Sequence, residues 1–263
     1  MGKAARTKAA RRKAPPPVGK QQPRVTQRSV LLITVGAAVV VAIVVGVLVA
    51  TQSSSKAPPA AAPSQGDRNA PAALVAAANK VGFKPNTEPG VGLIESQPAA
   101  AAQPATNQSL VAVGAAAPAF ALQTPEGATV SSRSLRGKTT LLEFFATWCP
   151  HCAAEAPHLE QIFSGLLKTK YAFASINADG EDAASVFAFH RYFGLTYPVL
   201  LDPSSHAGNF HSAGSAGPVT NAYKVEAFPT FYIVDAKGKI AWRSDGEQPD
   251  ALLRQELNRT ARA

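Results

Sequence analysis

The two cysteines of this 263-residue chain lie close together in the stretch LLEFFATWCPHC at 141–152, with only Pro150 and His151 between them. If a helix begins here, the first sulfur is exposed at its N-terminus, where free backbone N–H groups and the helix dipole stabilise a thiolate. The thiolate is the nucleophile of disulfide exchange, and the second sulfur lies about one turn further along the helix. The spacing therefore supplies an attacking thiol, Cys149, and a resolving thiol, Cys152.

Three other uses of the cysteine pair compete with this interpretation. A structural zinc site needs four ligands, and only His151, His158 and distant histidines are left, in none of the usual spacings. A structural disulfide closing a two-residue loop would remove little entropy from the unfolded chain. Binding of Cu(I) stays open as an alternative, because soft thiolates select that ion. We prefer the redox pair, Cys149 with Cys152, and expect no metal ion and no cofactor beyond their redox-active disulfide.

The elements that must position this pair are read from the pattern between Leu110 and the C-terminus. The sequence predicts a hairpin at 117–132, a strand at 139–147 and a helix over 150–167, in which Pro157 predicts a kink. The later elements are a strand at 171–179, a helix at 181–194, a strand at 198–202, a helix at 218–225, a hairpin at 228–244 and an amphipathic helix at 248–262. Alternating strands and helices with a terminal hairpin indicate an α/β fold whose sheet is mixed.

The motif EFFATWCPHC, followed by Glu155, Pro157 and much later by Phe228-Pro229-Thr230, resembles membrane-anchored thioredoxin-fold thiol:disulfide oxidoreductases of the TlpA/ResA type. The lead-in VGAAAPAFALQTPEGATVSSRSLRGK is similar to that of the same group and of the wider redoxin superfamily. The resemblance covers about residues 110–258. It implies a thioredoxin-like fold, with a central mixed β-sheet flanked by helices, and disulfide exchange with protein substrates.

The resemblance also implies roles for three further residues near the cysteines. Pro229 corresponds to the cis-proline that presents backbone to a bound substrate. Glu143 corresponds to the buried acid beneath the site, although thioredoxins usually carry the shorter Asp there. Because burial raises the pKa of a carboxyl group, Glu143 could accept the proton of Cys152 when that thiol attacks. Glu155 matches an acid that influences cysteine reactivity, with a solvated acid at the start of the helix as the alternative.

Aromatic and polar residues around the motif are expected to contact the substrate. Trp148 precedes the first cysteine and is predicted to form part of an exposed apolar rim. Phe228 and Thr230 flank the proline and are the other candidate substrate-binding residues. The sequence therefore predicts a docking surface made from two segments that are far apart along the chain.

The direction of electron flow stays open. His151 can donate a hydrogen bond or place positive charge near the Cys149 thiolate, which would make the disulfide a stronger oxidant. Pro150 and His151 also form the dipeptide of DsbA-like oxidases. The scaffold instead resembles reductases, such as those of cytochrome c maturation, and shows no clear room for the helical insertion of DsbA-like proteins. A peroxide-reducing redoxin is a further alternative, disfavoured because such proteins place Thr and Pro before a single reactive cysteine.

The basic charge of the chain is confined to its N-terminus. Of 26 Lys and Arg residues, nine lie between Lys3 and Arg28, where there is no acid, and the remainder balances the 17 Asp and Glu residues. A nucleic-acid-binding protein would carry basic residues on its folded part, so no nucleic-acid partner is expected. Residues 1–29 are predicted to be a disordered, basic cytoplasmic tail.

The 21 residues from 30 to 50 carry no charge and predict a single transmembrane helix in contact with the lipid bilayer. A cleaved signal peptide is the alternative, but its apolar region is normally about 7–15 residues long. Arg24 and Arg28 precede the segment and only Lys56 follows closely, so the N-terminus is expected in the cytoplasm. The chain is thus predicted to be a single-pass protein of the bacterial cell membrane with an extracytoplasmic catalytic domain, where disulfides persist.

The remaining domain boundaries follow from composition. Residues 51–109 are rich in Ala and Pro and are predicted to be an extracytoplasmic tether, in which the more apolar stretch 73–95 is a candidate for a short docked element. Residues 110–263 are expected to form the thioredoxin-like domain. The expected partners are protein thiols or disulfides and a membrane redox partner.

Overall fold

The computed structural model describes residues 70–86, 91–92, 98, 109–204 and 216–263, all within one compact unit, Ala60–Ala263. The predicted tail 1–29, the predicted transmembrane segment 30–50 and most of the predicted tether 51–109 lie outside the described residues. Within the described ranges, no helix has the length and hydrophobicity needed to cross a membrane.

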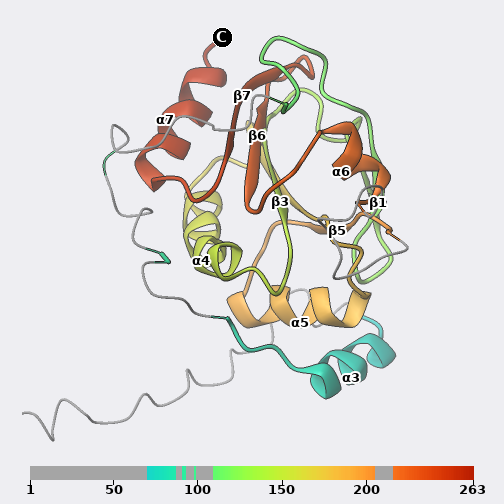
Figure 1. Cartoon of the computed structure of the whole chain (residues 1–263). Coiled ribbons are helices and arrows are strands. Elements are labelled where there is room, and N and C mark those ends of the chain that lie inside the picture. Colours follow the sequence, from blue (N-terminus) through green and yellow to red (C-terminus); the bar gives the residue numbers. More distant parts are fainter. Residues whose placement is uncertain (1–69, 87–90, 93–97, 99–108, 205–215) are drawn as a thin grey trace, which may run out of the picture. The chain divides into compact units, whose positions relative to one another are not determined.

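The described residues contain a seven-stranded sheet in the order β2-β1-β5-β4-β3-β6-β7 (Figure 1). The β3–β4 and β4–β5 pairs are parallel, and the remaining neighbours are antiparallel. The strands are β1 (Ala121–Gln123), β2 (Thr129–Ser131), β3 (Thr139–Phe145), β4 (Tyr171–Asn177), β5 (Val199–Leu201), β6 (Thr230–Val234) and β7 (Ile240–Asp245). The predicted mixed sheet with antiparallel edges is therefore confirmed, and its strand order is that of a thioredoxin-like fold with an added N-terminal hairpin.

Helices cover both faces of this sheet. They are α3 (Ala72–Val81), α4 (Pro150–Ser164), α5 (Ala183–Phe193), α6 (Pro218–Ala222) and α7 (Asp250–Thr260). Figure 1 shows α4 and α7 on one side of the central strands and α6 on the other. Helix α4 is continuous through Pro157, where the sequence predicts a kink.

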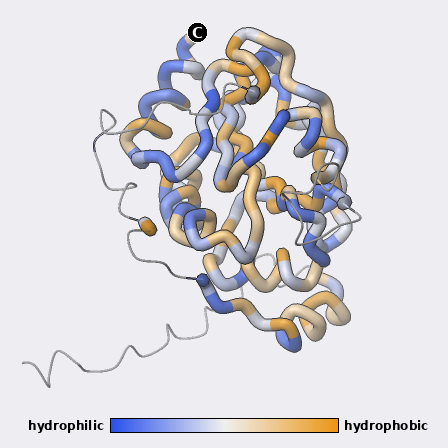
Figure 2. Tube along the Cα trace, viewed as in Figure 1, coloured by the Kyte–Doolittle hydropathy of each residue, from blue (hydrophilic) through white to orange (hydrophobic). Residues whose placement is uncertain are grey.

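Side chains alternate across β3, so this fully buried strand feeds two separate cores. Leu141 and Phe145 belong to the cluster that includes Leu159 of α4 and Leu257 of α7. The alternate residues Leu142 and Phe144 belong to the cluster on the α6 side. Figure 2 shows the hydrophobic residues gathered along the central strands and the hydrophilic ones along much of α7. Because Glu143 alternates with Leu142 and Phe144, it lies on the α4 side of the sheet.

A short element from the N-terminal stretch packs on α5. Ala78 of α3 is buried against α5, and the ring of Phe83 lies edge-on to Phe189 at a centroid distance of 5.1 Å. The Arg191 guanidinium donates a hydrogen bond to Asn79 at 2.9 Å. The docked element proposed within 73–95 is therefore confirmed.

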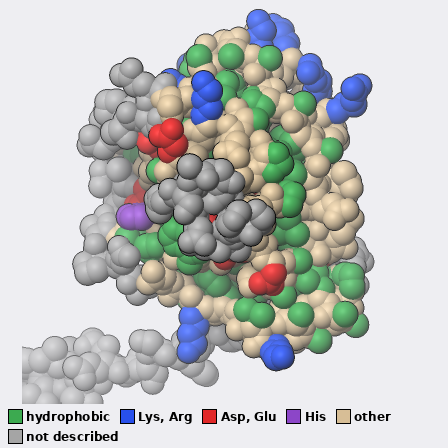
Figure 3. Space-filling view, turned by 45° about the vertical axis from the view of Figure 1, so that its right-hand side comes forward, with side chains coloured by type: hydrophobic (Ala, Val, Ile, Leu, Met, Phe, Trp, Pro, Cys, Tyr) green, Lys and Arg blue, Asp and Glu red, His purple; other side chains and the backbone are tan. Residues whose placement is uncertain are grey.

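Figure 3 shows one face of the molecule with its charged groups. The Lys and Arg side chains visible among the described residues lie around the margin of this face. They form no basic stripe in the part of the face that the described residues make up.

Candidate functional site

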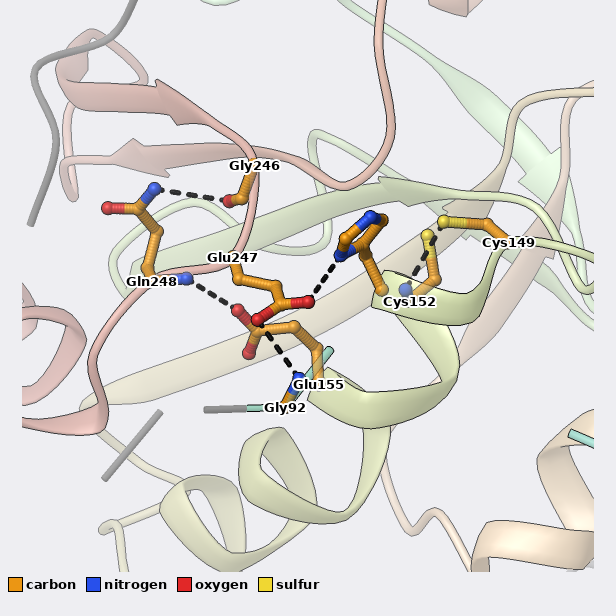
Figure 4. Close-up of polar contacts among 8 residues, drawn as sticks. Gly92, Cys149, Cys152, Glu155, Gly246, Glu247 and Gln248 are labelled. Carbon is orange, nitrogen blue, oxygen red and sulfur yellow. Dashed lines mark hydrogen bonds and ion pairs between the residues drawn. The ribbon is translucent and has the colours of Figure 1, made fainter. Parts of the chain in front are cut away.

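Both cysteines lie at the N-terminus of α4, as predicted, and both are free thiols. Cys149 is the N-cap, Pro150 takes the first helical position, where a missing N–H costs nothing, and the Cys152 N–H donates to the Cys149 sulfur at 3.2 Å (Figure 4). The prediction of an exposed sulfur is wrong, because the Cys149 residue is only 3% exposed. It belongs to the core cluster against which Phe228 packs.

The two thiols have opposite acidities. The pKa of the Cys149 thiol is lowered, chiefly because the Cys152 thiol hydrogen-bonds to it, with backbone N–H groups of Cys152 and His151 adding to the effect. Burial raises the pKa of the Cys152 thiol well above its ordinary value, and its contact with Cys149 raises it further. Cys149 is therefore the thiol that ionises first and can attack, whereas Cys152 needs a proton acceptor before it can resolve a mixed disulfide.

Glu143 supplies a carboxyl group on the same side of the sheet. It is 4% exposed, and burial raises its pKa to about 7, although a hydrogen bond from the Ser175 hydroxyl partly offsets the shift. Its charge raises the pKa of both Cys149 and Cys152, so it lies within electrostatic reach of both thiols. Its Oε1 atom has no hydrogen-bond partner among the described residues. The structure thus buries Glu143 as predicted and leaves one oxygen able to take up a proton.

Ser175 reaches Glu143 because of the β3–β4 register, which pairs the two residues directly. The buried Tyr197 ring belongs to the same cluster as Phe145 and Phe231, and the charge of Glu143 contributes to the raised pKa of the Tyr197 hydroxyl. The carboxyl group is therefore held in largely apolar surroundings.

The His151 imidazole is engaged away from the dithiol. Its Nδ1 atom contacts the carboxylate of Glu247, a residue in the loop between β7 and α7 (Figure 4). The prediction assigned the ring to the Cys149 thiolate, whereas the structure shows that the backbone N–H of His151 is the group that acts on Cys149. The ring is instead held by this long-range contact with Glu247.

Glu155 is fully buried, so the alternative of a solvated acid is excluded. Its Oε1 atom accepts a hydrogen bond of 2.6 Å from the backbone N–H of Gln248. The residue is thereby tied to the same loop that contacts His151. It lies one helical turn after Cys152, as the spacing predicts.

The Phe228–Pro229 peptide bond is cis, as the resemblance implies, and Pro229 is buried. Trp148 is 45% exposed, and its ring lies edge-on to Phe228 with centroids 6.0 Å apart. These two aromatic residues form the rim next to the dithiol that the sequence predicts. Thr230 differs, because its side chain is fully buried and its hydroxyl donates to the Ala227 carbonyl at 2.8 Å. Its place in the structure is beneath the rim.

Acidic residues in the loop after β4 hold the segment before Cys149. The Glu181 carboxylate accepts hydrogen bonds from the Thr147 N–H, at 2.7 Å, and from the Thr147 hydroxyl. The Trp148 indole N–H donates to Asp179 at 2.8 Å. These contacts fix the approach of the chain to the helix. Sequence reasoning missed them, as it missed Ser175 and Glu247, because no local motif marks them.

The described residues contain no group of three or more His, Cys, Asp or Glu side chains placed to hold a metal ion.

A free dithiol capping a helix, next to a cis-proline on a sheet of this order, defines a thioredoxin-fold thiol:disulfide oxidoreductase. Residues 113–243 match the AhpC/TSA family. The thiol-disulfide oxidoreductase ResA of Geobacillus thermodenitrificans is 31% identical over 152 residues, which cover 58% of this chain and 80% of that protein. ResA of Geobacillus kaustophilus is 32% identical over 135 residues, or 51% and 70% of the two chains. The chain belongs to the TlpA/ResA-like redoxins.

The solved structures agree on the fold. The solution structure of a candidate protein disulfide isomerase from Bacteroides thetaiotaomicron aligns with a TM-score of 0.50 and 27% identity, covering 59% of this chain and 96% of that one. The protein is thus an oxidoreductase of the thiol-disulfide class, and its direction, location and substrates are questions for a proposal.

Proposed function

We propose that the protein reduces disulfides of protein substrates outside the cytoplasm, held at the bacterial membrane by residues 30–50 with its N-terminus in the cytoplasm. The observation that carries the exchange chemistry is the unequal dithiol above a buried acid: the pKa of Cys149 is lowered, that of Cys152 is raised and that of Glu143 is about 7. The uncharged 21-residue segment and the basic residues before it support the location.

In the first step, the Cys149 thiolate attacks one sulfur of a substrate disulfide. The substrate S–S bond breaks, a mixed disulfide with Cys149 forms, and the first substrate sulfur leaves as a thiolate that takes up a proton from solvent. The Trp148 and Phe228 rim, together with the backbone at Pro229, would hold the substrate segment beside Cys149. Because the substrate segment would dock on an apolar rim before the disulfide reacts, the protein could accept differing substrates.

In the second step, the Glu143 carboxylate takes the proton of the Cys152 thiol. The Cys152 sulfur then attacks Cys149, the internal S–S bond forms and the second substrate sulfur leaves as a thiolate. Two electrons have passed from the dithiol to the substrate. A membrane redox partner must supply two electrons and two protons to restore the dithiol before the next turnover.

One observation supports reduction as the direction. The His151 ring that distinguishes the Cys-Pro-His-Cys motif is paired with Glu247. A carboxylate balances positive charge on the imidazole, so the ring stabilises the Cys149 thiolate less than an unpaired histidine would. The reduced form is correspondingly less favoured, and the dithiol is a better electron donor.

The test is the reduction potential of the Cys149–Cys152 pair in the purified full chain, measured by equilibration with glutathione, together with reduction of insulin disulfides. A potential near the low end of the range from about −270 to −120 mV, with insulin reduction, supports the proposal. A value near the high end would assign the protein to the oxidases. High-affinity Cu(I) binding without exchange activity would instead support the copper-carrying alternative, and turnover of peroxide would support the peroxide-reducing one.

A further inference from the structure

The loop between β7 and α7 joins the two segments that form the active site. The Gly246 N–H donates to the carbonyl of Pro229, the cis-proline, at 2.8 Å. Two residues later, the Gln248 N–H donates to the Glu155 carboxylate of α4 at 2.6 Å (Figure 4). Gly246 has a φ of +77°, a conformation that glycine adopts without strain. The loop therefore contacts the proline segment on one side and the dithiol helix on the other.

Glu247, between these two anchors, directs its carboxylate at the dithiol helix. One oxygen contacts His151 Nδ1, and the other accepts a hydrogen bond of 3.2 Å from the Gly92 N–H. The Glu247 side chain is 9% exposed, whereas the His151 side chain is 47% exposed. Glu247 is thus a nearly buried acid whose two oxygens both have partners, one of them inside the Cys-Pro-His-Cys motif.

The contact also determines which nitrogen of His151 carries the proton. An ionised carboxylate can only accept hydrogen bonds, so the Nδ1 atom must donate to it. When the imidazole is neutral, its single proton is then on Nδ1 and Nε2 has none. His151 lies two residues after Cys149 in the first turn of the dithiol helix, and its backbone N–H acts on the Cys149 sulfur.

We propose that Glu247 is a positioning residue for the dithiol, which fixes the orientation and tautomer of His151 and thereby tunes the equilibrium between dithiol and disulfide. The inference rests on the dithiol exchange described above but not on its direction. Gly92, from the stretch that precedes the catalytic domain, binds the same carboxylate, so that stretch helps to hold Glu247 in place.

The experiment uses the full chain, labelled with ¹⁵N at histidine, in four forms: wild type, Glu247→Ala, Glu247→Gln and the control Glu126→Ala in the distant β1–β2 turn. The ¹⁵N chemical shifts of His151, assigned by its loss in His151→Ala, report the tautomer at a pH where the ring is neutral. Equilibration with glutathione reports the dithiol–disulfide equilibrium, and thermal unfolding reports whether each variant is folded.

We expect the wild type and Glu126→Ala to show Nδ1 protonated, and Glu247→Ala to shift the proton toward Nε2. Glu247→Gln retains an acceptor oxygen and should keep more of the Nδ1 form. A ring that Glu247 no longer holds is free to turn and to donate a hydrogen bond from Nε2, which should favour the thiolate, so Glu247→Ala shifts the equilibrium toward the dithiol by about two- to tenfold. Most of that shift should disappear when Glu247→Ala is combined with His151→Ala.

A purely structural Glu247 would give a different pattern. If Glu247→Ala lowers thermal stability but leaves the His151 tautomer and the equilibrium unchanged, the inference is overturned. An equally large shift in the His151→Ala background would also overturn it, because Glu247 would then act without His151. The tautomer measurement needs no turnover. A chain that fails to exchange disulfides would therefore count against the proposed function, while the His151 tautomer would still test the role of Glu247.

Discussion

Two glutamates near the same dithiol have different surroundings. Glu143 lies beneath it, on the central strand, with a single hydrogen-bonding hydroxyl and an apolar cluster around it. Glu247 lies in the loop between β7 and α7, where an imidazole and a backbone N–H occupy both of its oxygens. The acid without strong partners has its pKa raised to about 7 and can accept a proton, whereas the fully partnered acid can hold a neighbour in place.

Residue type alone does not assign a role to an acid near a reactive thiol. Glu155 makes the same point, because it is fully buried and yet accepts a short backbone hydrogen bond from Gln248. What distinguishes Glu143 is that burial raises its pKa to about 7, with the Ser175 hydroxyl only partly offsetting the shift.

The largest effect should come from removing the attacking thiol, on which both acids act. Cys149→Ser should abolish insulin reduction by the full chain, because a hydroxyl is not ionised at neutral pH and cannot attack a disulfide. Cys152→Ser should instead stop after the first step and accumulate a mixed disulfide, visible by mass spectrometry. Exchange activity that survives in Cys149→Ser would remove the basis for the whole site.

Glu143→Gln should slow resolution of the mixed disulfide by about 10²-fold, because a general base of this kind typically contributes 10²–10⁴-fold. Formation of the mixed disulfide should change much less, since Cys149 is acidic without help from Glu143. Stopped-flow measurement of the two phases separates the steps. Glu247→Gln serves as the matched control for a nearby acid. An equal slowing of resolution in both variants would mean that Glu143 is not the specific proton acceptor.

Glu143 should also make stability depend on pH. Its pKa is raised from 4.5 to about 7 on folding, so the native state binds more protons than the unfolded state between these values. The contribution of Glu143 to the free energy of unfolding is therefore fully present below about pH 4.5 and is lost as pH rises through about 7. For a shift of this size the loss is roughly 3 kcal/mol.

Denaturation of the reduced chain in urea at several pH values measures this loss of stability. Glu143→Gln should remove most of the pH dependence and raise the free energy of unfolding at alkaline pH. Glu126→Gln, in the β1–β2 turn, should behave as the wild type. A wild-type stability that is flat between pH 4.5 and 7 would argue that Glu143 is ionised in the folded chain throughout this range.

The smallest effect is expected for the hydroxyl that contacts Glu143. The Ser175 hydrogen bond favours the ionised carboxylate and lowers its pKa, so Ser175→Ala should raise that pKa further, by up to about one unit. The pH profile of mixed-disulfide resolution should move to higher pH by the same amount. A profile that stays in place or moves to lower pH would mean that the hydroxyl does not stabilise the charge.

The parts of the site that lie close together in the sequence could be predicted from it. The helix that begins at the motif places Cys149, Pro150 and Cys152. The alternation of side chains along β3 places Glu143 on the face of the sheet toward that helix. The order of strands and helices followed from hydrophobic pattern, and the docked helix α3 from one apolar stretch within a polar one.

The parts that depend on contacts between distant segments could not be predicted. Glu247 meets His151 across 96 positions, and Ser175 meets Glu143 only because of the parallel β3–β4 register. Cys149 is likewise buried in a core cluster against which Phe228 packs, and the fold rather than the helix brings Phe228 there. Local rules describe a helix end, but they do not describe what the remainder of the chain places on top of it.

The most direct test of the central claim is a titration of the Glu143 carboxyl group in the reduced full chain, followed by ¹³C NMR of labelled glutamate and assigned with Glu143→Gln. We expect this carboxyl group to ionise with a midpoint of about 7, because burial disfavours its charge. A midpoint near the ordinary value of 4.5 would contradict it, since Glu143 would then be ionised well below neutral pH and would be a weak acceptor for the Cys152 proton.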